Sequence, residues 1–566
     1  MKLNNEKGVA LAFTLFIMMI LLGLSSLFVL RTIQESRLAA RERAEAKSFY
    51  LAEAATNSGL EGLDTLINNY MLNTIGTTNP SVVISQAQGY VSSGDAIGFL
   101  VYAVKNSGTP MLTLNGTQAE YQISPTVLGG GTYQYQIVFT EKSNPVATGP
   151  DSWDFPFYYR LEASSEISSS DKDIVLSGDF TVQVQRDNFA KYALFTNEQT
   201  MPNGTNVWFT NKTNFNGPMH TNGRYNFYGN PSGTFNGGVT QEDLLARFYN
   251  SGSSISMDDD NNGTIDVPIF NAGYTRAAPA VTLSSPSQQQ DIIDQATAGN
   301  SYGSNGIYLP NSSGALTGGI YVRGDSTINL SVDGSNNAVY TITQGSTTKT
   351  ITVNKSTNQT TVVTAGTPVT YNGIPDGVDD VGTIIYVRGD IDSLSGTVQD
   401  STELTISSRD DIVIQDDLTY SSYTPGSGTP GTVGYVPPHA DGAQNLLGLV
   451  AWEGNVRVGT SAPDDVNIHA TILAKTGEFQ VDSYDSTGIG PRGIATLLGG
   501  VISDYYGAFG QFNGSTGAQI SGYGRNFVYD ERMSSGSAPP YFPSLNTFIA
   551  FTNDITDKMV WQEGNT

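Results

Sequence analysis

The chain opens with MKLNNEKGVALAFTLFIMMILLGLSSLFVLRTIQESRLAARERAEAKSFYLAEAA, residues 1–55. Its uncharged run from Val9 to Leu30 would span about 33 Å as a helix, enough to cross a bilayer core of about 30 Å. A secretory signal peptide has an apolar region of roughly 7–15 residues that ends at a small-residue cleavage site. This run is longer and meets Arg31 without such a site. We therefore predict a membrane-spanning helix.

The helical pattern continues beyond the apolar run. Residues 31–71 contain no proline, and their glycines are Gly59 and Gly62. Acidic and basic side chains alternate here and leave an apolar stripe through Phe49, Ala52, Ala55, Leu60, Leu63 and Ile67. The sequence thus predicts one continuous helix, of which the first half is a membrane segment and the second half an amphipathic support.

These residues resemble the N-termini of type IV prepilins and type II secretion pseudopilins. A short polar leader ends in Lys7-Gly8, and the uncharged run begins at Val9. The phrase AKSFYLAEAA, residues 46–55, is similar to PilX-like minor pilins in particular. The resemblance implies cleavage after Gly8 by the prepilin peptidase and residence in the inner membrane. It also implies later assembly with other pilins or pseudopilins into an extracellular filament or at the cell surface.

Phe13 departs from the pattern of the major pilins, which carry glutamate at this fifth mature position. The resemblance implies that this glutamate pairs with the amino terminus of a neighbouring subunit. A carboxylate in lipid without such a partner costs about 2.5–3.5 kcal/mol. A subunit with phenylalanine does not need that neighbour, so we expect a filament-tip or initiating subunit. The alternative is that Phe13 is an ordinary lipid-facing residue of a static anchor.

The charges that flank the apolar run do not fit an exported C-terminus. Lys2 and Lys7 precede the run, whereas Arg31, Arg37, Arg41, Arg43 and Lys47 follow it. The usual distribution places the basic residues on the side that stays inside the cell. This conflict stays open.

The composition of the remaining chain indicates short strands and many turns. The sequence has 62 Gly and no Cys, and serine, threonine and asparagine are abundant. We therefore expect a mainly β chain with one long N-terminal α-helix and without disulfides. The 28 basic and 53 acidic residues give a net charge of −25, which argues against nucleic acid as a partner.

Strand-like runs at 133–139, 157–163 and 178–186 predict an antiparallel sheet that packs on the second half of the helix, and a parallel β-helix-like domain follows. The expected parts are a leader at 1–8, a transmembrane or filament-core helix at 9–30, an amphipathic extension at 31–75, a pilin-like antiparallel sheet domain at 76–190, a β-helix-like domain at 191–325 and 365–545, an inserted β-hairpin region at 326–364 and a C-terminal tail at 546–566. Residues 76–125 carry no clear pattern.

Two internal repeats favour the parallel β-helix. The hexapeptide IYVRGD occurs at 320–325 and again at 385–390. A shorter pattern, small residue-x-x-Gly-x-apolar, begins at Ala451, Ala474 and Thr496. Repeats of about 20–25 residues with one short strand per corner are typical of stacked coils. An open β-sandwich or barrel is the alternative, because residues 326–364 show hairpin spacing.

The C-terminal block carries a second resemblance. Its segments GLVAWEGNVRVG, APDDVNIHATILA, SGYGRNFVYDERM and APPYFP lie between Gly448 and Pro543. They resemble a C-terminal β-rich domain of unknown function found on large bacterial pilin-like proteins. The resemblance implies a structural role at the cell surface and supplies no chemistry.

One local motif indicates a bound cation. Asp258, Asp260, Asn262 and Asp266 place oxygen ligands at alternating positions, Gly263 permits the turn, and Thr264 offers its backbone carbonyl. We therefore predict a candidate Ca²⁺ site. The twelfth position is Ile269, so the usual bidentate acid is missing. The alternative is an acidic surface turn.

Other polar motifs have a simpler structural interpretation. The Arg-Gly-Asp triplets at 323–325 and 388–390 each end an apolar strand, where Gly and Asp favour a turn. His220, His439 and His469 are too far apart in sequence to indicate zinc, and His469 fits a buried strand. Adjacent acids such as Asp410-Asp411 point to opposite faces of a strand, so each pair could place only one carboxyl group in a groove. Glycoside hydrolysis uses two such groups.

The sequence therefore favours a protein that is not an enzyme. We expect a large minor pilin or pseudopilin that displays a β-helix-like surface domain for adhesion or assembly, with an unknown surface or carbohydrate ligand. The alternatives are a statically membrane-anchored adhesin and, from a different class, a polysaccharide-active β-helix enzyme.

Overall fold

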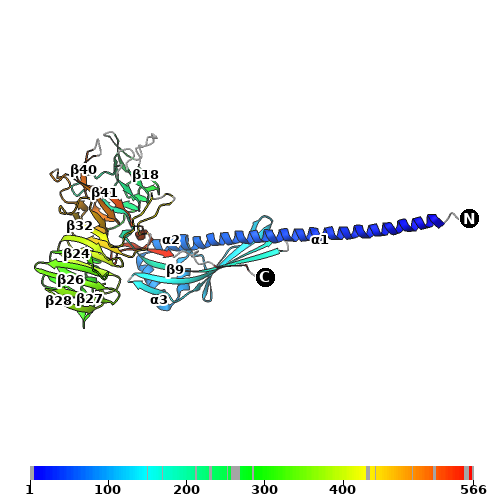
Figure 1. Cartoon of the computed structure of the whole chain (residues 1–566), viewed down its shortest axis with the longest axis horizontal. Helices are drawn as coiled ribbons and strands as arrows, with labels where there is room; N and C mark the ends of the chain where they lie inside the picture. The colour runs from blue at the N-terminus through cyan, green and yellow to red at the C-terminus, as the bar shows by residue number, and fades with distance from the viewer. Residues whose placement is uncertain are drawn as a thin grey trace. The chain divides into compact units, whose positions relative to one another are not determined.

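The computed structural model describes residues 5–149, 151–167, 170–210, 213–228, 233–250, 253–256, 268–283, 286–428, 432, 434–439, 442–486, 488–513, 518–552 and 560–563. The chain forms two compact units. Unit 1 comprises Met1–Gln185 and Thr547–Thr566, and unit 2 comprises Arg186–Asn546. The protein is mainly β with one long N-terminal helix, as the sequence predicted (Figure 1).

The long helix of unit 1 is α1, Asn5–Asp64, which continues through a π-helical segment, Thr65–Met71, into α2, Leu72–Thr77. Two further helices follow, α3 at Pro80–Ser93 and α4 at Ala96–Ala103. Asn79 and Asp95 cap their first turns, because their side chains accept hydrogen bonds from Ser81 N and Gly98 N. The first part of 76–190, expected to be an antiparallel sheet domain, is therefore helical.

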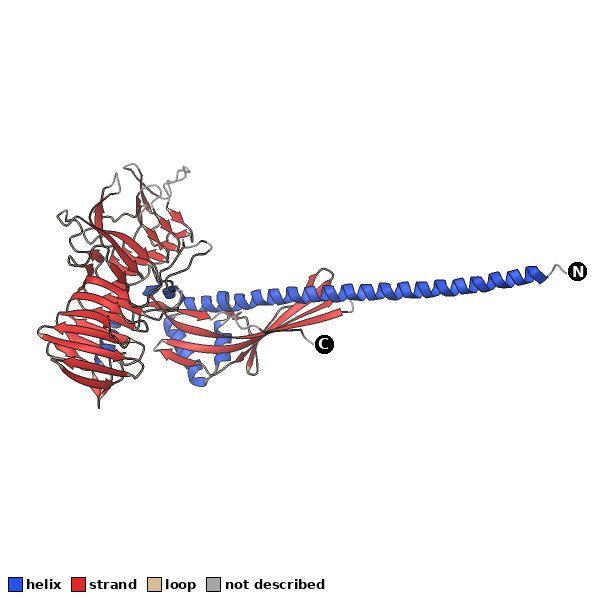
Figure 2. Cartoon of the chain, viewed as in Figure 1, coloured by secondary structure: helices blue, strands red, loops and turns tan. Residues whose placement is uncertain are grey.

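The sheet of unit 1 is antiparallel and lies against the second half of α1 (Figure 2). Along β8, Ser152–Ile167, buried and more exposed side chains alternate, so Trp153, Phe155 and Phe157 share the covered face. The strand order is β3 (Thr113–Asn115), β4 (Gln118–Gln122), β6 (Gly131–Glu141), β8, β9 (Ser170–Asn188) and β42 (Ser544–Thr552); β5 (Thr126–Leu128), β7 (Val146–Gly149) and β43 (Val560–Glu563) join at the sides, and β1 (Lys105–Asn106) with β2 (Thr109–Pro110) forms a separate small hairpin.

The C-terminal residues differ from the expected tail at 546–566. They supply strands β42 and β43, both of which pair with β9. Within unit 1, the Phe548 ring stacks on Trp153 with 6.0 Å between the ring centroids. The chain end is thus built into the sheet and the core of unit 1.

One sheet of unit 2 consists mostly of parallel strands in close register. Its order is β19 (Tyr274–Thr275), β15 (Val239–Gln241), β12 (Met219–Thr221), β10 (Leu194–Glu198), β39 (Val501–Tyr505), β36 (Thr471–Ala474), β33 (Leu446–Ala451), β31 (Glu403–Ser408), β29 (Thr383–Arg388), β23 (Ile320–Arg323) and β20 (Gly306–Tyr308). Strands such as β33 are buried along their whole length, which explains their continuous apolar sequence.

The order of this sheet shows that the chain enters it in the middle. From β10 the strands proceed outward to β19, and the chain then passes through α5, Pro286–Thr297, to β20 and β23 at the other end. Strands β29, β31, β33, β36 and β39 follow in sequence order, until Val501 of β39 pairs with Leu194 of β10. Early and late segments of unit 2 therefore meet inside one sheet.

The second large sheet of unit 2 combines an antiparallel meander with parallel strands. Its order is β21 (Asn311–Ser312), β22 (Ala315–Leu316), β28 (Thr367–Asn372), β27 (Gln359–Thr364), β26 (Thr347–Asn354), β25 (Ala338–Gln344), β24 (Ser326–Val332), β30 (Ile391–Val398), β32 (Ile412–Tyr420), β35 (Asn467–His469), β38 (Pro491–Leu498), β41 (Gln519–Val528) and β40 (Gly510–Phe512). In addition, β34 (Val456–Val458) pairs with β32, and β37 (Phe479–Val481) pairs with β34. Smaller sheets contain β11 (Asn214–Phe215), β14 (Thr234–Phe235) and β18 (Ile269–Phe270), and β13 (Asn226–Tyr228), β16 (Arg247–Asn250) and β17 (Ser253–Ser256). Short 3₁₀ turns lie at Phe189–Lys191 and Glu531–Ser535.

The inserted region expected at 326–364 is larger in the structure and is not separate from the rest. The meander runs from β24 through β28, and so extends to Asn372. Its first strand also pairs in parallel with β30, where Ile328 faces Leu394. The hairpin spacing predicted the antiparallel strands correctly, but the hydrogen bonds of β24 join the meander to the stacked strands.

The hexapeptide repeat pairs with itself in register. Ile320 lies beside Ile385 and Arg323 beside Arg388, so both copies of IYVR occupy equivalent positions on neighbouring parallel strands. Ala451 likewise lies beside Ala474, and Val456 beside Phe479. The third copy of the shorter pattern does not pair in register with the second, because its first residue, Thr496, pairs with Asn467 instead.

Candidate functional sites

The first half of α1 exposes an apolar surface. Its side chains from Val9 to Leu30 make no buried contacts within the described chain, and Phe28 is 70% exposed. By length and composition this helix could cross a membrane, and a signal sequence near the N-terminus would have the same properties. In Figure 1 this blue segment extends beyond the sheet of unit 1.

The predicted processing and core positions all lie on this exposed segment. Val9 is 66% exposed and Phe13 is 65% exposed. A Cβ placed on Gly8 would meet no other described atom within 4 Å. The geometry therefore leaves Gly8 and Val9 accessible to another protein, and it leaves Phe13 free to contact lipid or a neighbouring helix.

The second half of α1 belongs to the core of unit 1. Ser48 is buried, and its hydroxyl lies 3.0 Å from the hydroxyl of Ser165 on β8. Gly59 lets α1 approach the sheet, because a Cβ there would lie 2.9 Å from Leu161 Cδ2. The buried apolar residues include Ala52, Ala55 and Leu63 of α1, and Leu66 and Ile67 of the π-helical segment that continues it. The apolar stripe predicted from the sequence is thus the face that packs on the sheet, although Phe49 and Leu60 are only partly buried and, of these two, Leu60 still packs against the core.

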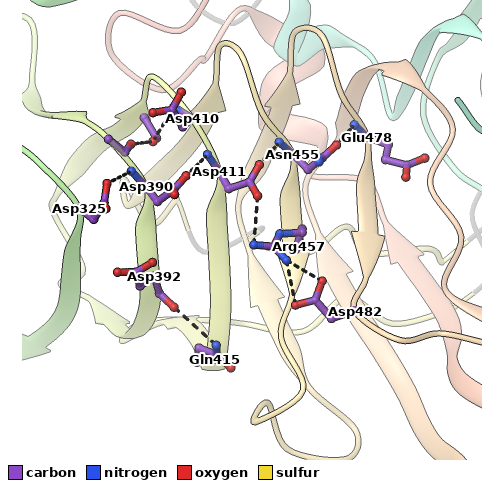
Figure 3. A network of polar contacts seen from close by, with 12 residues as sticks. Asp325, Asp390, Asp392, Asp410, Asp411, Gln415, Asn455, Arg457, Glu478 and Asp482 are labelled. Atoms are coloured by element: carbon purple, nitrogen blue, oxygen red, sulfur yellow. Dashed lines mark hydrogen bonds and ion pairs between the residues drawn. The ribbon is translucent and has the colours of Figure 1, made fainter. Parts of the chain in front are cut away.

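A ladder of carboxylate and amide side chains crosses the stacked turns of unit 2 (Figure 3). We call Asp325, Asp390, Asp411 and Asn455 the Asx ladder. Each Oδ1 accepts a hydrogen bond from the backbone N–H of the next turn: Asp390 N at 3.0 Å, Asp411 N at 2.9 Å, Asn455 N at 2.7 Å and Glu478 N at 3.0 Å, respectively. These bonds satisfy backbone donors where the strands end.

The Asx ladder explains the Arg-Gly-Asp triplets as turns. Gly389 has φ +156, and a Cβ there would lie 2.6 Å from Asp325 Oδ1. Asp325 and Asp390 are the aspartates of the two triplets, and the side chain of each holds the following turn. Arg457 reinforces the ladder, because its guanidinium lies 3.0 Å from Asp411 Oδ2 and 3.0 Å from Asp482 Oδ1.

The predicted cation motif lies outside the described residues. Asp258, Asp260, Asn262, Thr264 and Asp266 all fall in the range 257–267, so the Ca²⁺ site stays a prediction. Within the described part of the chain, no group of three or more His, Asp or Glu side chains is placed to hold a metal ion.

All three histidines of unit 2 are buried, as the sequence indicated for His469, and the rings of His439 and His469 both pack against Tyr420. His220 Nδ1 lies 2.8 Å from Thr240 Oγ1, and His469 Nδ1 accepts a hydrogen bond from Tyr420 N at 3.1 Å. Burial lowers the pKa of His220, and burial followed by the neighbouring His439 lowers the pKa of His469 to about 4. Both rings are therefore neutral packing residues at pH 7.

Sequence reasoning missed the Asx ladder. The local signal was present, because Gly389-Asp390 and Gly454-Asn455 repeat a glycine followed by an Asx residue at strand ends. What the sequence did not show is which turn lies next to which. Asp411 and Asn455, for example, are joined across the intervening 412–454 segment.

Comparison with known proteins gives one family match. Residues 154–243 match the model described as Domain of unknown function (DUF4900). The matched stretch begins in β8 of unit 1 and ends just after β15 of unit 2, and it lies apart from the block at 448–543 in which we expected such a domain. No curated protein and no solved structure matches the chain.

Proposed function

We propose that the protein is a large minor pilin or pseudopilin, anchored in the inner membrane before it joins an extracellular filament. The observation that carries this proposal is the division of α1 into two halves. The first half exposes apolar side chains, whereas the second half is buried against an antiparallel sheet. This arrangement lets one helix serve first as a membrane anchor and then as the core of a filament, while unit 1 remains folded.

We further propose that unit 2 is a parallel β-helix-like domain displayed for adhesion or assembly. The in-register parallel pairs, such as Ile320 with Ile385 and Ala451 with Ala474, support stacked coils. The Asx ladder supports the same interpretation, because side-chain ladders of this kind link successive turns. A rigid stack of this sort suits the presentation of a surface away from the membrane.

The tip or initiating role rests on Phe13. With phenylalanine at this position, α1 brings no carboxylate into the apolar segment from Val9 to Leu30. It therefore needs no partner to neutralise a charge in the filament core. A subunit of this kind can occupy a position with no neighbour beyond it.

A static membrane-anchored adhesin is the second candidate. The exposed apolar run is long enough to serve as a permanent anchor, whereas the excess of basic residues after Leu30 opposes export of the C-terminal part for either candidate. The two candidates differ in one respect that can be tested: only the pilin role requires cleavage between Gly8 and Val9.

The test is the mature N-terminus of the wild type and of two glycine variants. Gly8→Glu should abolish cleavage and hold the chain in the inner membrane. Gly89→Glu places the same charge on an exposed glycine of α3 with open space around it, and it should leave cleavage intact. A wild-type chain that starts at Met1 would favour the static anchor, and one that starts after Leu30 would refute both candidates.

A further inference from the structure

Unit 2 contains a strongly polar cavity at the ends of β23 and β29. Its volume is about 720 Å³, within the range of roughly 300–1,000 Å³ typical of ligand sites. Charged side chains of both signs line it, namely Arg323, Asp325, Arg388, Asp392 and Arg409. In a chain with a net charge of −25, a concentration of three arginines in one cavity is unusual.

Arg323 and Arg388 occupy equivalent positions on β23 and β29, and Arg409 directly follows the next strand, β31. Arg323 pairs directly with Arg388, and Arg409 N donates to Val387 O on the neighbouring strand. Adjacent strands lie about 4.8 Å apart, so the guanidinium groups leave one edge of the sheet side by side. Like charges opposite one another destabilise a sheet, and an anionic ligand would remove that cost.

Arg388 is the arginine whose charge is not satisfied within the protein. Arg323 Nη1 donates to Tyr302 O at 2.6 Å, and Arg409 Nε and Nη2 bind the carboxylate of its neighbour Asp410. Arg388 is exposed, and its guanidinium has no hydrogen bond or ion pair with any described residue. Its planar fork is therefore available for bidentate pairing with a carboxylate.

The same lining supplies hydrogen-bond acceptors. Asp392 is exposed, and Asp325 uses Oδ1 for the Asx ladder, which leaves Oδ2 available to a ligand. Burial, and then the charges of Asp325 and Asp390, raise the pKa of Asp392. Carboxylates accept hydrogen bonds from hydroxyl groups, which the arginines cannot do. The cavity thus matches a ligand that carries both an anion and hydroxyls.

Other ligand classes fit less well. The described lining has no aromatic side chain on which a nucleobase could stack. The flanking carboxylates of Asp325 and Asp392 would repel a doubly charged phosphate more strongly than a singly charged carboxylate. We propose that this cavity binds a saccharide that bears a carboxylate, with Arg388 pairing with the carboxylate and Asp392 accepting from a hydroxyl.

This inference concerns unit 2 alone and does not rest on the proposed filament role. The test uses the full chain in detergent micelles and trigalacturonic acid as the probe, with binding measured by isothermal titration calorimetry. The matched ligand is its methyl ester, in which the carboxylates are neutral. The acid should bind at least about tenfold more tightly than the ester, because a charge-assisted bidentate pair is lost.

Arg388→Gln should weaken binding of the acid by about tenfold and leave binding of the ester unchanged. Asp392→Asn should weaken binding of both the acid and the ester. Arg224→Gln removes the same charge from another part of unit 2 and should have no effect on either ligand. Unchanged thermal midpoints would confirm that these variants are folded.

Four outcomes of the saccharide titrations would overturn the proposal. They are no binding of the acid at millimolar concentration, equal binding of acid and ester, an Arg388→Gln variant that binds like the wild type, and displacement of the acid by an equal concentration of inorganic phosphate. A single-stranded DNA oligomer that binds as tightly as the acid would show an unselective polyanion surface, and would overturn it as well.

Discussion

Gly454 packs against Asp411 so closely that a Cβ on the glycine would overlap Asp411 Oδ1. The same Cβ would also lie 2.6 Å from the backbone carbonyl carbon of Asp410, so rotation of the Asp411 side chain cannot relieve the contact. The glycine that follows a strand and the Asx residue of the neighbouring turn thus form one structural element. Gly477 makes the same close approach to Asn455.

Gly454→Ala should therefore destabilise unit 2 by about 1–3 kcal/mol, since overpacking in a close-packed region costs that much. Gly334→Ala is the matched control, because a Cβ there meets no described atom within 4 Å. The measurement is the free energy of unfolding from urea titrations. Equal unfolding free energies for the two variants would contradict the close packing of the stacked turns.

The stability of unit 2 should fall between pH 6.5 and about 4 because of His469. Its pKa in the folded protein is lowered to about 4, chiefly by burial and then by His439, whereas an unfolded histidine titrates near 6.5. The unfolded chain therefore binds a proton that the folded chain does not, and stability present above pH 6.5 is lost as the pH falls. The loss approaches about 3 kcal/mol near pH 4.

His469→Asn should remove this pH dependence, because Asn does not titrate and its Oδ1 takes the position of His469 Nδ1, the acceptor of the hydrogen bond from Tyr420 N. Asp376, whose pKa burial raises to about 6, changes stability in the opposite direction over part of this range. The wild type and the variant share the contribution of Asp376. Each protein's unfolding free energy is measured at pH 7.5 and at pH 4.5, and the difference between the two pH-dependent changes is the contribution of His469. A variant with the same pH dependence as the wild type would refute this assignment.

Phe13→Glu should hinder the tip or initiating role, because it places an unpaired carboxylate in the apolar segment of α1. Gold-labelled antibodies against unit 2 should bind only at filament ends in the wild type. In the Phe13→Glu variant, fewer filaments should carry the label. Phe13→Leu keeps the segment apolar and should behave like the wild type. Labelling along the whole shaft in the wild type would contradict a tip position.

Ca²⁺ should stabilise the chain if Asp258, Asp260, Asn262, Thr264 and Asp266 bind it. The chain can be shortened by residues 1–37 without removing a buried side chain, because the first buried side chain described in α1 is that of Ser48. With Ile269 in place of the bidentate acid, we expect a dissociation constant on the order of 10⁻⁴ to 10⁻³ M. A hundredfold excess of Ca²⁺ over that value stabilises the folded state by about 2.7 kcal/mol.

Calorimetric scans in chelator, in Ca²⁺ and in Mg²⁺ at matched ionic strength would measure this effect. Asp258→Ala should abolish the rise in thermal midpoint caused by Ca²⁺. Identical midpoints in chelator and in Ca²⁺ would leave the motif as an acidic turn.

The sequence by itself determined the features that depend on local pattern. The absence of proline and the apolar stripe predicted α1, and the strand-like runs, such as the one that contains Phe157 and Tyr159, predicted the strands of unit 1. The identical copies of IYVRGD also indicated that two turns are equivalent, and they do pair in register. These signals are local because helix and strand periodicity is written in neighbouring residues.

Only the tertiary structure decided which distant segments meet. It placed Leu194 beside Val501, built the expected tail into the sheet of unit 1, made α3 and α4 helical, and brought Arg388 and Asp392 to one cavity. The sequence contains many short apolar runs of similar strength, and several could pair equally well as isolated strands. The choice among them depends on the packing of the whole core and on hydrogen bonds such as those of the Asx ladder, which form only when remote turns are already adjacent.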